Sequence, residues 1–416
     1  MPQSKHMWKD ENLKRFLETG YEEAPVVLPP ESMQAPIFSI RDGCLALKIM
    51  IEAKSIQWWI NGRRRQEMNI PLHILDGGDE TAMNHFIDEV TRLNDGEEMM
   101  FSGHNCHAAI PELQLRCKPF LHQLYGESGV CSNGVNLMMF GGKYTETPAG
   151  VHTDPCDIFL IPLIGGKRLL TWEWQLLDGN EGTEVPVKIP AKSLTINWRE
   201  EQHKAEVYCC NAGDILYFPV GYWHINDYQT AKNTFSFGIN VFKNSDFART
   251  IGAIQRKMRQ LPIADKIASM SAKCDESGEV LELDPTYAQY LALIEEAIRI
   301  NFLIRSSSAG FVTGIKLDTT VMAFSLNCPV RVRPYSRIFL VNCEDGRDTL
   351  ISNGMVAKLN LSADAKIIIS TLIETGKCDP TFFAQSGADP CLENVMNWLL
   401  QTGSVIQDSE IENAYV

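Results

Sequence analysis

The sequence lacks several features that would place it in a specialised class of protein. Its longest apolar stretches, residues 158–164 and 367–369, fall far short of the roughly 20 residues needed to cross a bilayer. The first 16 residues have no apolar signal-peptide segment and are too acidic for a typical transit peptide. No internal repeat or low-complexity tract is apparent. These absences predict a cytoplasmic protein that does not span a membrane.

Paired cysteines and excess positive charge are also absent. The 12 cysteines are dispersed without a CxxC pair, so neither a disulfide framework nor a zinc knuckle is indicated. Lys and Arg number 38 against 52 Asp and Glu, which gives a formal net charge of −14. A phosphate backbone is bound by clustered cations, so we expect no direct nucleic-acid ligand.

The remaining composition is that of an ordinary globular protein, with 44% hydrophobic and 22% charged residues, and 416 residues favour two or three domains. Changes in hydrophobic periodicity predict an α+β protein in four parts. Residues 1–130 are expected to be mainly helical, with helices at 9–16, 81–93 and 111–125. Residues 131–244 have the period of strands and predict a β-sandwich or barrel. Residues 245–310 return to a helical pattern, and 325–416 mix strands and helices in the order of a winged-helix-like domain.

A possible metal site stands out in the β-rich part. His152 and Asp154 are two apart in a strand-like run, so their side chains project to one face. A glycine-led strand then ends in His224. Two histidines and one carboxylate leave three adjacent positions of an octahedron open, an arrangement that suits non-haem Fe(II) with a bidentate cosubstrate and oxygen. The alternative is that both histidines are ordinary core residues with satisfied hydrogen bonds.

Three segments of this part, PAGVHTDPCDIFLIPLIGGKR, GDILYFPVGYWH and NTFSFGINVF, resemble the JmjC/cupin-type Fe(II)- and 2-oxoglutarate-dependent oxygenases. The similarity is greatest to the ribosomal oxygenases and the factor-inhibiting asparaginyl hydroxylase. It implies a double-stranded β-helix (jelly-roll) core, with 2-oxoglutarate as cosubstrate. It also implies that His152, Asp154 and His224 are the catalytic iron ligands.

The resemblance further implies which residues bind the cosubstrate. A Lys or Arg fifteen residues after the first iron histidine pairs with the distal carboxylate, and that position is Lys167 here. A dicarboxylate in an apolar barrel needs such a cation, because an unpaired buried charge costs several kcal/mol. Arg168 has the opposite strand parity and is expected to face away. The further cosubstrate-site candidates are Asn240, Asn136, Thr147 and Ser236.

The predicted activity is hydroxylation of an unactivated C–H bond, with a protein or peptide side chain as the preferred substrate. Two alternatives remain open: the same chemistry on a free amino acid or natural-product intermediate, and a non-catalytic cupin scaffold. In the ribosomal oxygenases the middle helices pair two subunits. Residues 245–304 therefore either form a homodimer or pack on their own barrel.

Two weaker patterns lie in the N-terminal part. His104, Cys106 and His107 offer three donor atoms, but without a second distant pair of ligands we expect core or loop residues and no zinc site. The adjacent Trp58 and Trp59 are interpreted as packing residues.

Overall fold

The computed structural model describes residues 7–129, 131, 134–172, 192–194, 197–242, 272–274, 280–283, 286–311, 324–325, 327–333, 335–343, 346–385 and 390–407. The chain divides into two compact units, residues 1–244 and 245–416. Among the described residues, no helix combines the length and the apolar character required of a membrane span.

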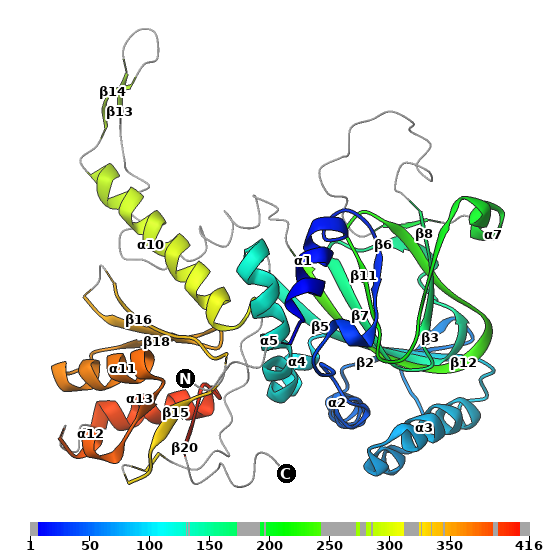
Figure 1. Cartoon of the computed structure of the whole chain (residues 1–416), viewed down its shortest axis with the longest axis horizontal. Coiled ribbons are helices and arrows are strands. Elements are labelled where there is room, and N and C mark those ends of the chain that lie inside the picture. Colours follow the sequence, from blue (N-terminus) through cyan, green and yellow to red (C-terminus); the bar gives the residue numbers. More distant parts are fainter. Residues whose placement is uncertain are drawn as a thin grey trace. The chain divides into compact units, whose positions relative to one another are not determined.

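The first unit combines helices with a large sheet (Figure 1). Its helices are α1 (Asp10–Thr19), α2 (Ile40–Glu52), α3 (Glu80–Leu93), α4 (Cys106–Ala109), α5 (Pro111–Ser128) and α7 (Trp198–Glu201), with short 3-10 turns at Pro30–Ser32, Leu72–Gly77 and Gln202–Lys204. Its strands are β1 (Val26–Leu28), β2 (Ile56–Ile60), β3 (Arg63–Arg65), β4 (Met99–Gly103), β5 (Gly134–Glu146), β6 (Val151–Thr153), β7 (Asp157–Ile164), β8 (Lys167–Trp172), β9 (Lys192–Leu194), β10 (Glu206–Cys210), β11 (Ile215–Phe218) and β12 (Trp223–Phe242).

Local capping fixes where the N-terminal helices begin. The Ser39 hydroxyl accepts the Asp42 N–H at 3.2 Å and the Asp42 carboxylate accepts the Ser39 N–H at 2.7 Å, a capping box that starts α2. The Asp79 carboxylate accepts the Ala82 N–H at 2.8 Å at the start of α3. These bonds satisfy N–H groups that have no partner inside the helix.

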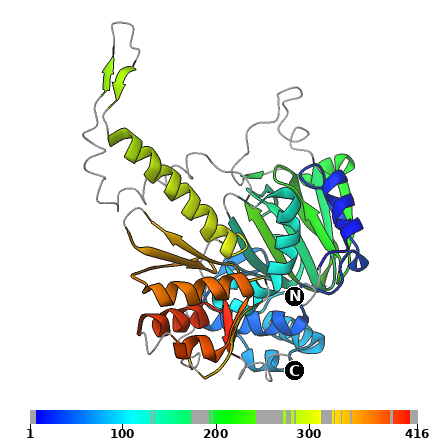
Figure 2. The same cartoon turned by 60° about the vertical axis from the view of Figure 1, so that its left-hand side comes forward.

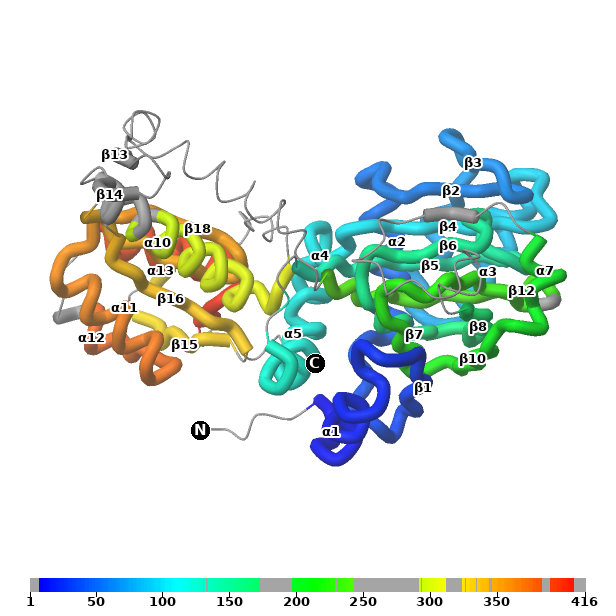
Figure 3. The backbone as a smooth tube through the Cα atoms, turned by 90° about the horizontal axis from the view of Figure 1, so that it is seen from above, coloured from blue at the N-terminus to red at the C-terminus, as the bar shows by residue number. Residues whose placement is uncertain are grey.

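The long strand β12 joins the two layers of the barrel. Its C-terminal half pairs with β5 and β7, whereas its first residues pair with β6 and β8. The larger layer has the order β1-β11-β7-β12-β5-β4-β2-β3, and the part from β12 through β5, β4 and β2 to β3 can be followed in Figure 3. The register between β12 and β5 shifts between Asp227 and Lys232, where β12 passes from one layer to the other.

The central strands of the larger layer are buried on both faces, and β7 and β11 are accordingly almost continuously apolar. On β12, the odd-numbered Phe235, Phe237, Ile239 and Val241 are fully buried on the outer face. There Phe237 packs on Phe38 with ring centroids 4.5 Å apart, and α2 and α3 cover this face (Figure 1). Helix α1 packs on the same barrel beside β1 (Figure 2). Even-numbered residues such as Gly238 and Asn240 face the barrel interior.

The predicted jelly-roll core, its strands and the helices at 9–16, 81–93 and 111–125 are confirmed. Residues 1–130 contain more helix than strand, as expected, and their short strands β1 to β4 in addition join the barrel's larger layer. Strands β1 and β4 pair with strands distant in the sequence, which periodicity alone does not indicate, whereas β2 and β3 form a local hairpin that the sequence analysis missed. The first part of the predicted helical region 245–310, residues 245–271, lies outside the described residues.

The second unit contains short strands and helices around its own core. Its elements are β13 (Ala272–Cys274), β14 (Val280–Leu283), α10 (Thr286–Ser307), β15 (Val330–Val332), β16 (Ile338–Asn342), β17 (Asp348–Ser352), β18 (Met355–Leu359), α11 (Ala363–Thr375), β19 (Lys377–Cys378), α12 (Pro380–Gln385), α13 (Pro390–Gln401) and β20 (Val405–Gln407). The strands β16, β17 and β18 form an antiparallel sheet, with α10 and α11 on opposite sides (Figures 1 and 2). Val330, Leu350, Ile369 and Leu399 are fully buried in the core between these elements.

Candidate active site

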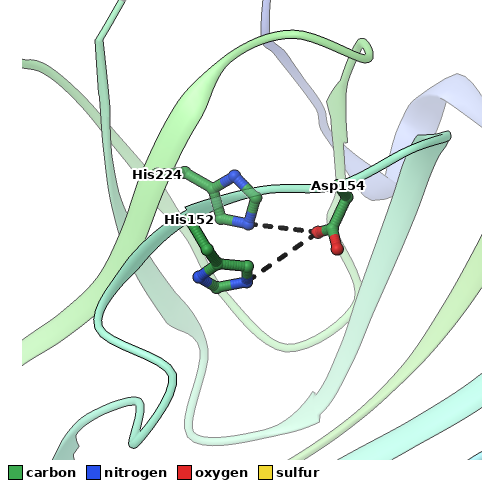
Figure 4. A group of neighbouring side chains, drawn as sticks. All are labelled: His152, Asp154 and His224. Atoms are coloured by element: carbon green, nitrogen blue, oxygen red, sulfur yellow. Dashed lines mark ion pairs between the residues drawn. The ribbon is translucent and has the colours of Figure 1, made fainter. Parts of the chain in front are cut away.

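The two predicted iron histidines meet across paired strands. His152 is the middle residue of β6 and His224 the second residue of β12, and the two are direct partners in the antiparallel register. Asp154 follows β6 immediately. Its Oδ2 lies 3.2 Å from His224 Nε2 and 3.9 Å from His152 Nε2 (Figure 4). One ligand atom from each residue lies within 4.8 Å of the other two, which is close enough to hold a single metal ion.

Backbone carbonyls fix the orientation of both imidazoles. His152 Nδ1 lies 2.9 Å from the Gly150 carbonyl oxygen, and His224 Nδ1 lies 3.1 Å from the Tyr222 carbonyl oxygen. A carbonyl only accepts, so each Nδ1 carries the proton and donates it. Each Nε2 is then left with a free lone pair directed at Asp154. Hydrogen bonds from the other ring nitrogen, such as these from Nδ1 to backbone carbonyls, typically orient histidines that bind a metal.

Burial sets the protonation state of the three side chains. Burial, with a smaller contribution from the nearby His224, lowers the pKa of His152 to about 4, and this net value includes the opposite effect of Asp154. Burial alone would raise the pKa of Asp154, but the close approach of His224 and His152 outweighs burial and lowers that pKa. At neutral pH the site therefore contains a neutral His152 and an ionised Asp154, the forms that bind a metal.

The triad opens into a cavity of about 230 Å³ inside the barrel. Lys167, the first residue of β8, lines this cavity and is only 3% exposed. Its Nζ donates to the Tyr144 hydroxyl at 2.9 Å and lies 5.4 and 5.3 Å from the ring centroids of Tyr144 and Tyr228. The neighbouring Arg168 is bound to Asp227 instead, as its opposite strand parity predicted.

Three buried polar atoms of the lining have no hydrogen-bond partner. They are Thr147 Oγ1, Asn226 Oδ1 and Asn240 Oδ1. The Asn240 amide nitrogen contacts Met138 Sδ at 2.8 Å, so its oxygen remains open toward the cavity. Unsatisfied buried polar atoms are costly in a folded protein, and their grouping around one cavity indicates a polar ligand. Two of them, Thr147 and Asn240, were predicted from the sequence.

The other two candidates, Asn136 and Ser236, are not part of the cavity lining. Asn136 is the register partner of Asn240, but its side-chain oxygen accepts the Asn105 N–H at 2.9 Å, where α4 begins. Ser236 is fully buried with an unpaired hydroxyl, and its register partner Phe140 lines the cavity in its place. The odd or even position of a residue along a strand thus predicts which face of the sheet its side chain lies on. It does not show whether that side chain reaches the cavity.

Several lining residues were missed by the sequence analysis. Tyr144 lines the cavity, and its ring and that of Tyr228 flank the Lys167 amine. Tyr144 has the same β5 parity as Met138 and Phe140, a signal that could have identified it. A further wall of the cavity comes from β2 and β4 and contains Gln57, Trp59, Met100, Ser102 and His104. Trp59, interpreted as a packing residue, belongs to this wall.

The alternative zinc cluster around residue 104 is not assembled. His104 lines the cavity, whereas His107 is fully buried and its Nδ1 accepts the Leu137 N–H at 3.4 Å. The Cys106 thiol donates to the Gly103 carbonyl at 3.7 Å. Within the described ranges, His152, Asp154 and His224 are the group of three side chains positioned for a metal.

Comparison with known proteins identifies the barrel. Residues 128–247 match the protein family described as JmjC domain. The bifunctional lysine-specific demethylase and histidyl-hydroxylase NO66 from Dictyostelium discoideum is 29% identical over 171 residues. These residues are 39% of this chain and 28% of that relative, so the matched part is a little over a quarter of its length.

Solved structures share the fold. Two structures of Escherichia coli YcfD, described in one of them as a ribosomal oxygenase, superpose with TM-scores of 0.52 and 0.50 at 14% sequence identity. They cover 97% and 95% of this chain and 100% and 97% of their own chains. The resemblance that the sequence motifs indicated is confirmed: the chain contains a JmjC domain, with the jelly-roll core of the cupin-type 2-oxoglutarate-dependent oxygenases.

Proposed function

We propose that this protein is an Fe(II)- and 2-oxoglutarate-dependent oxygenase that hydroxylates an unactivated C–H bond. The observation that carries the proposal is the pairing of two sites in one cavity. A two-histidine, one-carboxylate triad lies on one side, and the buried Lys167 ammonium lies on another. Together the triad and Lys167 can bind a dicarboxylic acid, with one end chelating the metal and the carboxylate at the other end paired with the lysine.

The triad fits Fe(II) by the chemistry of its donors. Two neutral imidazole nitrogens and one carboxylate oxygen form the ligand set typical of non-haem Fe(II) oxygenases, whereas structural zinc sites are closed by four ligands. When bound, the iron would supply the site at which O2, the oxidant, oxidises 2-oxoglutarate and the substrate together: one oxygen atom would become the new hydroxyl and the other would enter succinate, with carbon dioxide released. The roles of His152, Asp154 and His224 are to hold the metal and to leave adjacent positions open.

Lys167 is proposed to bind the distal carboxylate of 2-oxoglutarate. In the described part of the chain no carboxylate lies within ion-pair distance of its Nζ, although the side chain is almost completely buried. A buried cation without a counter-ion costs several kcal/mol, so an anionic ligand would stabilise this arrangement. The Tyr144 hydroxyl orients the amine, and the open oxygens of Thr147, Asn226 and Asn240 provide polar contacts around the ligand.

A protein or peptide side chain is the proposed substrate. The Dictyostelium relative is named for action on histidyl and lysyl residues, and YcfD is described as a ribosomal oxygenase. Hydroxylation is preferred because it requires only that a C–H bond be held near the iron. Asn136 and Ser236, which the resemblance also implied as cosubstrate-site residues, do not line the cavity and are not proposed to contact the cosubstrate.

We further propose a cytoplasmic homodimer formed through α10, with residues 325–416 in a structural or substrate-docking role. Ile298 and Phe302 of α10 are 50% and 55% exposed, and they are one helical turn apart on the same face. Exposed large apolar side chains in such a stripe are typical of an interface. The net charge of −14 makes a direct nucleic-acid partner unfavourable.

The proposed activity is tested by an anaerobic titration. The purified protein, freed of metal, is titrated with Fe(II) and then with 2-oxoglutarate, and the visible spectrum is recorded for a metal-to-ligand charge-transfer band. The band should appear only when both are present. Oxygen-isotope incorporation into lysate peptides and metabolites then separates a protein substrate from a small molecule. Absence of both metal binding and the band would favour the non-catalytic scaffold.

A further inference from the structure

One wall of the cavity comes from outside the matched JmjC segment. We define the β2–β4 wall as Gln57, Trp59, Met100, Ser102 and His104, all of which line the cavity. Gln57 pairs with Ser102 and Trp59 with Met100 in the antiparallel register, so these side chains share one face of the sheet. His104 follows β4 with the same parity. The wall precedes residue 128, where the family match begins.

The polar side chains of this wall are not used by the protein itself. Within the described ranges, no hydrogen bond or ion pair engages the side chain of Gln57, Ser102 or His104. Ser102 is nevertheless only 4% exposed, and its hydroxyl faces the cavity. The wall contains no Lys, Arg, Asp or Glu side chain. The wall therefore presents donors and acceptors without a charge.

The remainder of the cavity offers no spare charge to a substrate. Among the described lining residues, the charged groups are Asp154, which belongs to the metal triad, and Lys167, which is assigned to the cosubstrate. A cationic or anionic side chain entering this cavity would lose its hydration without gaining a counter-ion, and this costs several kcal/mol. An uncharged side chain avoids that cost and can satisfy the polar groups of the wall.

We propose that the β2–β4 wall selects the substrate: Gln57, Ser102 and His104 hydrogen-bond an uncharged polar side chain, of carboxamide type, and hold it beside the metal triad. This inference rests on the proposed oxygenase function. A site built to hydrogen-bond a substrate discriminates strongly against groups that leave its polar atoms unpaired. Trp59 and Met100 provide the apolar surface against which the aliphatic part of that side chain packs.

The test uses small probes that represent side-chain ends. The full-length protein is loaded with Zn(II), which cannot be oxidised, and with 2-oxoglutarate, whose binding is measured first by calorimetry. The His104 ring signal, assigned with the His104→Gln variant, is followed by NMR. Propionamide, propylguanidinium, propylammonium and propionate are titrated separately. Ser102→Ala is compared with Ser55→Ala, a matched change in a residue that precedes β2 and does not line the cavity.

Propionamide should shift the His104 signal to saturation, and the charged probes should not shift it at the same concentration. Ser102→Ala should weaken propionamide binding about fivefold, the effect of one ordinary hydrogen bond, whereas Ser55→Ala should leave it unchanged. The inference is overturned if a charged probe binds as well as propionamide, if Ser102→Ala binds like the unchanged protein, or if no probe moves the signal. Failure to bind 2-oxoglutarate would instead contradict the proposed function, and the probes would then be compared on the zinc-loaded protein.

Discussion

His152 and His224 are partners in a single antiparallel register pair, with ring centroids 4.3 Å apart, although 71 positions separate them in the sequence. The hydrogen-bond ladder between β6 and β12 therefore sets the spacing of the two ligands. Asp154 completes the group just beyond the end of β6. Metal binding should depend on each of the three side chains.

We expect Asp154→Ala to abolish turnover and to weaken Fe(II) binding by more than about 100-fold, because even the residues that only orient metal ligands contribute 10- to 100-fold. Calorimetric titration of Fe(II) under anaerobic conditions measures this loss directly. The exposed Asp76→Ala, which removes a surface ion pair with Lys48, is the control and should bind iron normally. Full activity of Asp154→Ala would contradict the triad assignment.

Lys167→Ala should raise the concentration of 2-oxoglutarate required for half-maximal turnover by 10-fold or more, with little effect on Fe(II) affinity. The reason is that the distal carboxylate of the cosubstrate would lose its buried cation. Lys143→Ala provides a matched control. Lys143 lies on β5 next to Tyr144, but its amine pairs with Asp88 at the surface. Equal cosubstrate requirements for the two variants would exclude Lys167 as the anchor.

Acid should destabilise the metal-free protein through His107. Burial lowers its pKa from 6.5 to about 4 in the folded state, so the unfolded chain takes up the proton first as the pH falls. Stability is therefore intact above pH 6.5 and is lost progressively between pH 6.5 and 4, by up to about 3 kcal/mol at 1.36 kcal/mol per pKa unit.

Urea unfolding at a series of pH values measures this effect. The His107→Gln variant keeps a polar side chain but cannot titrate, so its free energy of unfolding should fall less steeply over the same range. If the slopes of the two proteins coincide, His107 is not responsible for the acid sensitivity.

Gly142→Ala should destabilise the larger layer of the barrel. The backbone of Gly142 has φ +139°, and a Cβ there would lie 2.0 Å from the Met99 carbonyl oxygen on the paired strand β4. Forcing a methyl group into packed structure costs about 1–3 kcal/mol.

Gly126→Ala is the contrasting variant. Gly126 lies in α5, and no atom lies within 4 Å of the position of the new methyl group. It should stabilise the helix by up to about 1 kcal/mol. Thermal unfolding distinguishes the two.

The α10 stripe should control the oligomeric state. Phe302→Glu is expected to convert a dimer of twice 46.7 kDa into a monomer, as measured by light scattering during gel filtration. Ile367→Glu introduces the same charge at a 61% exposed position on α11 and should leave the dimer intact. A dimer that persists in Phe302→Glu would place the interface elsewhere.

The metal triad could be predicted from the sequence because its information is local. His152 and Asp154 are two apart in a strand-like run, and His224 follows the glycine-led strand β11 after a short turn, at the start of β12. Lys167 followed from the family resemblance. The cavity wall could not be predicted in this way, because it requires Gln57 to pair with Ser102, a register set by tertiary packing between distant strands. The same limit applies to Asn136. Its position along β5 does not reveal that its side-chain oxygen accepts a hydrogen bond from the Asn105 N–H.

The cavity is assembled from two separate stretches of the polypeptide, with the metal triad, Lys167 and Asn240 inside residues 128–247 and the β2–β4 wall before residue 128. Substitutions in the earlier stretch can therefore alter what the cavity accepts without altering the iron ligands. Such a division allows one reaction to be retained while its target diverges between related proteins. It also means that the JmjC segment expressed alone would keep the ligands for the metal and lose one side of the pocket.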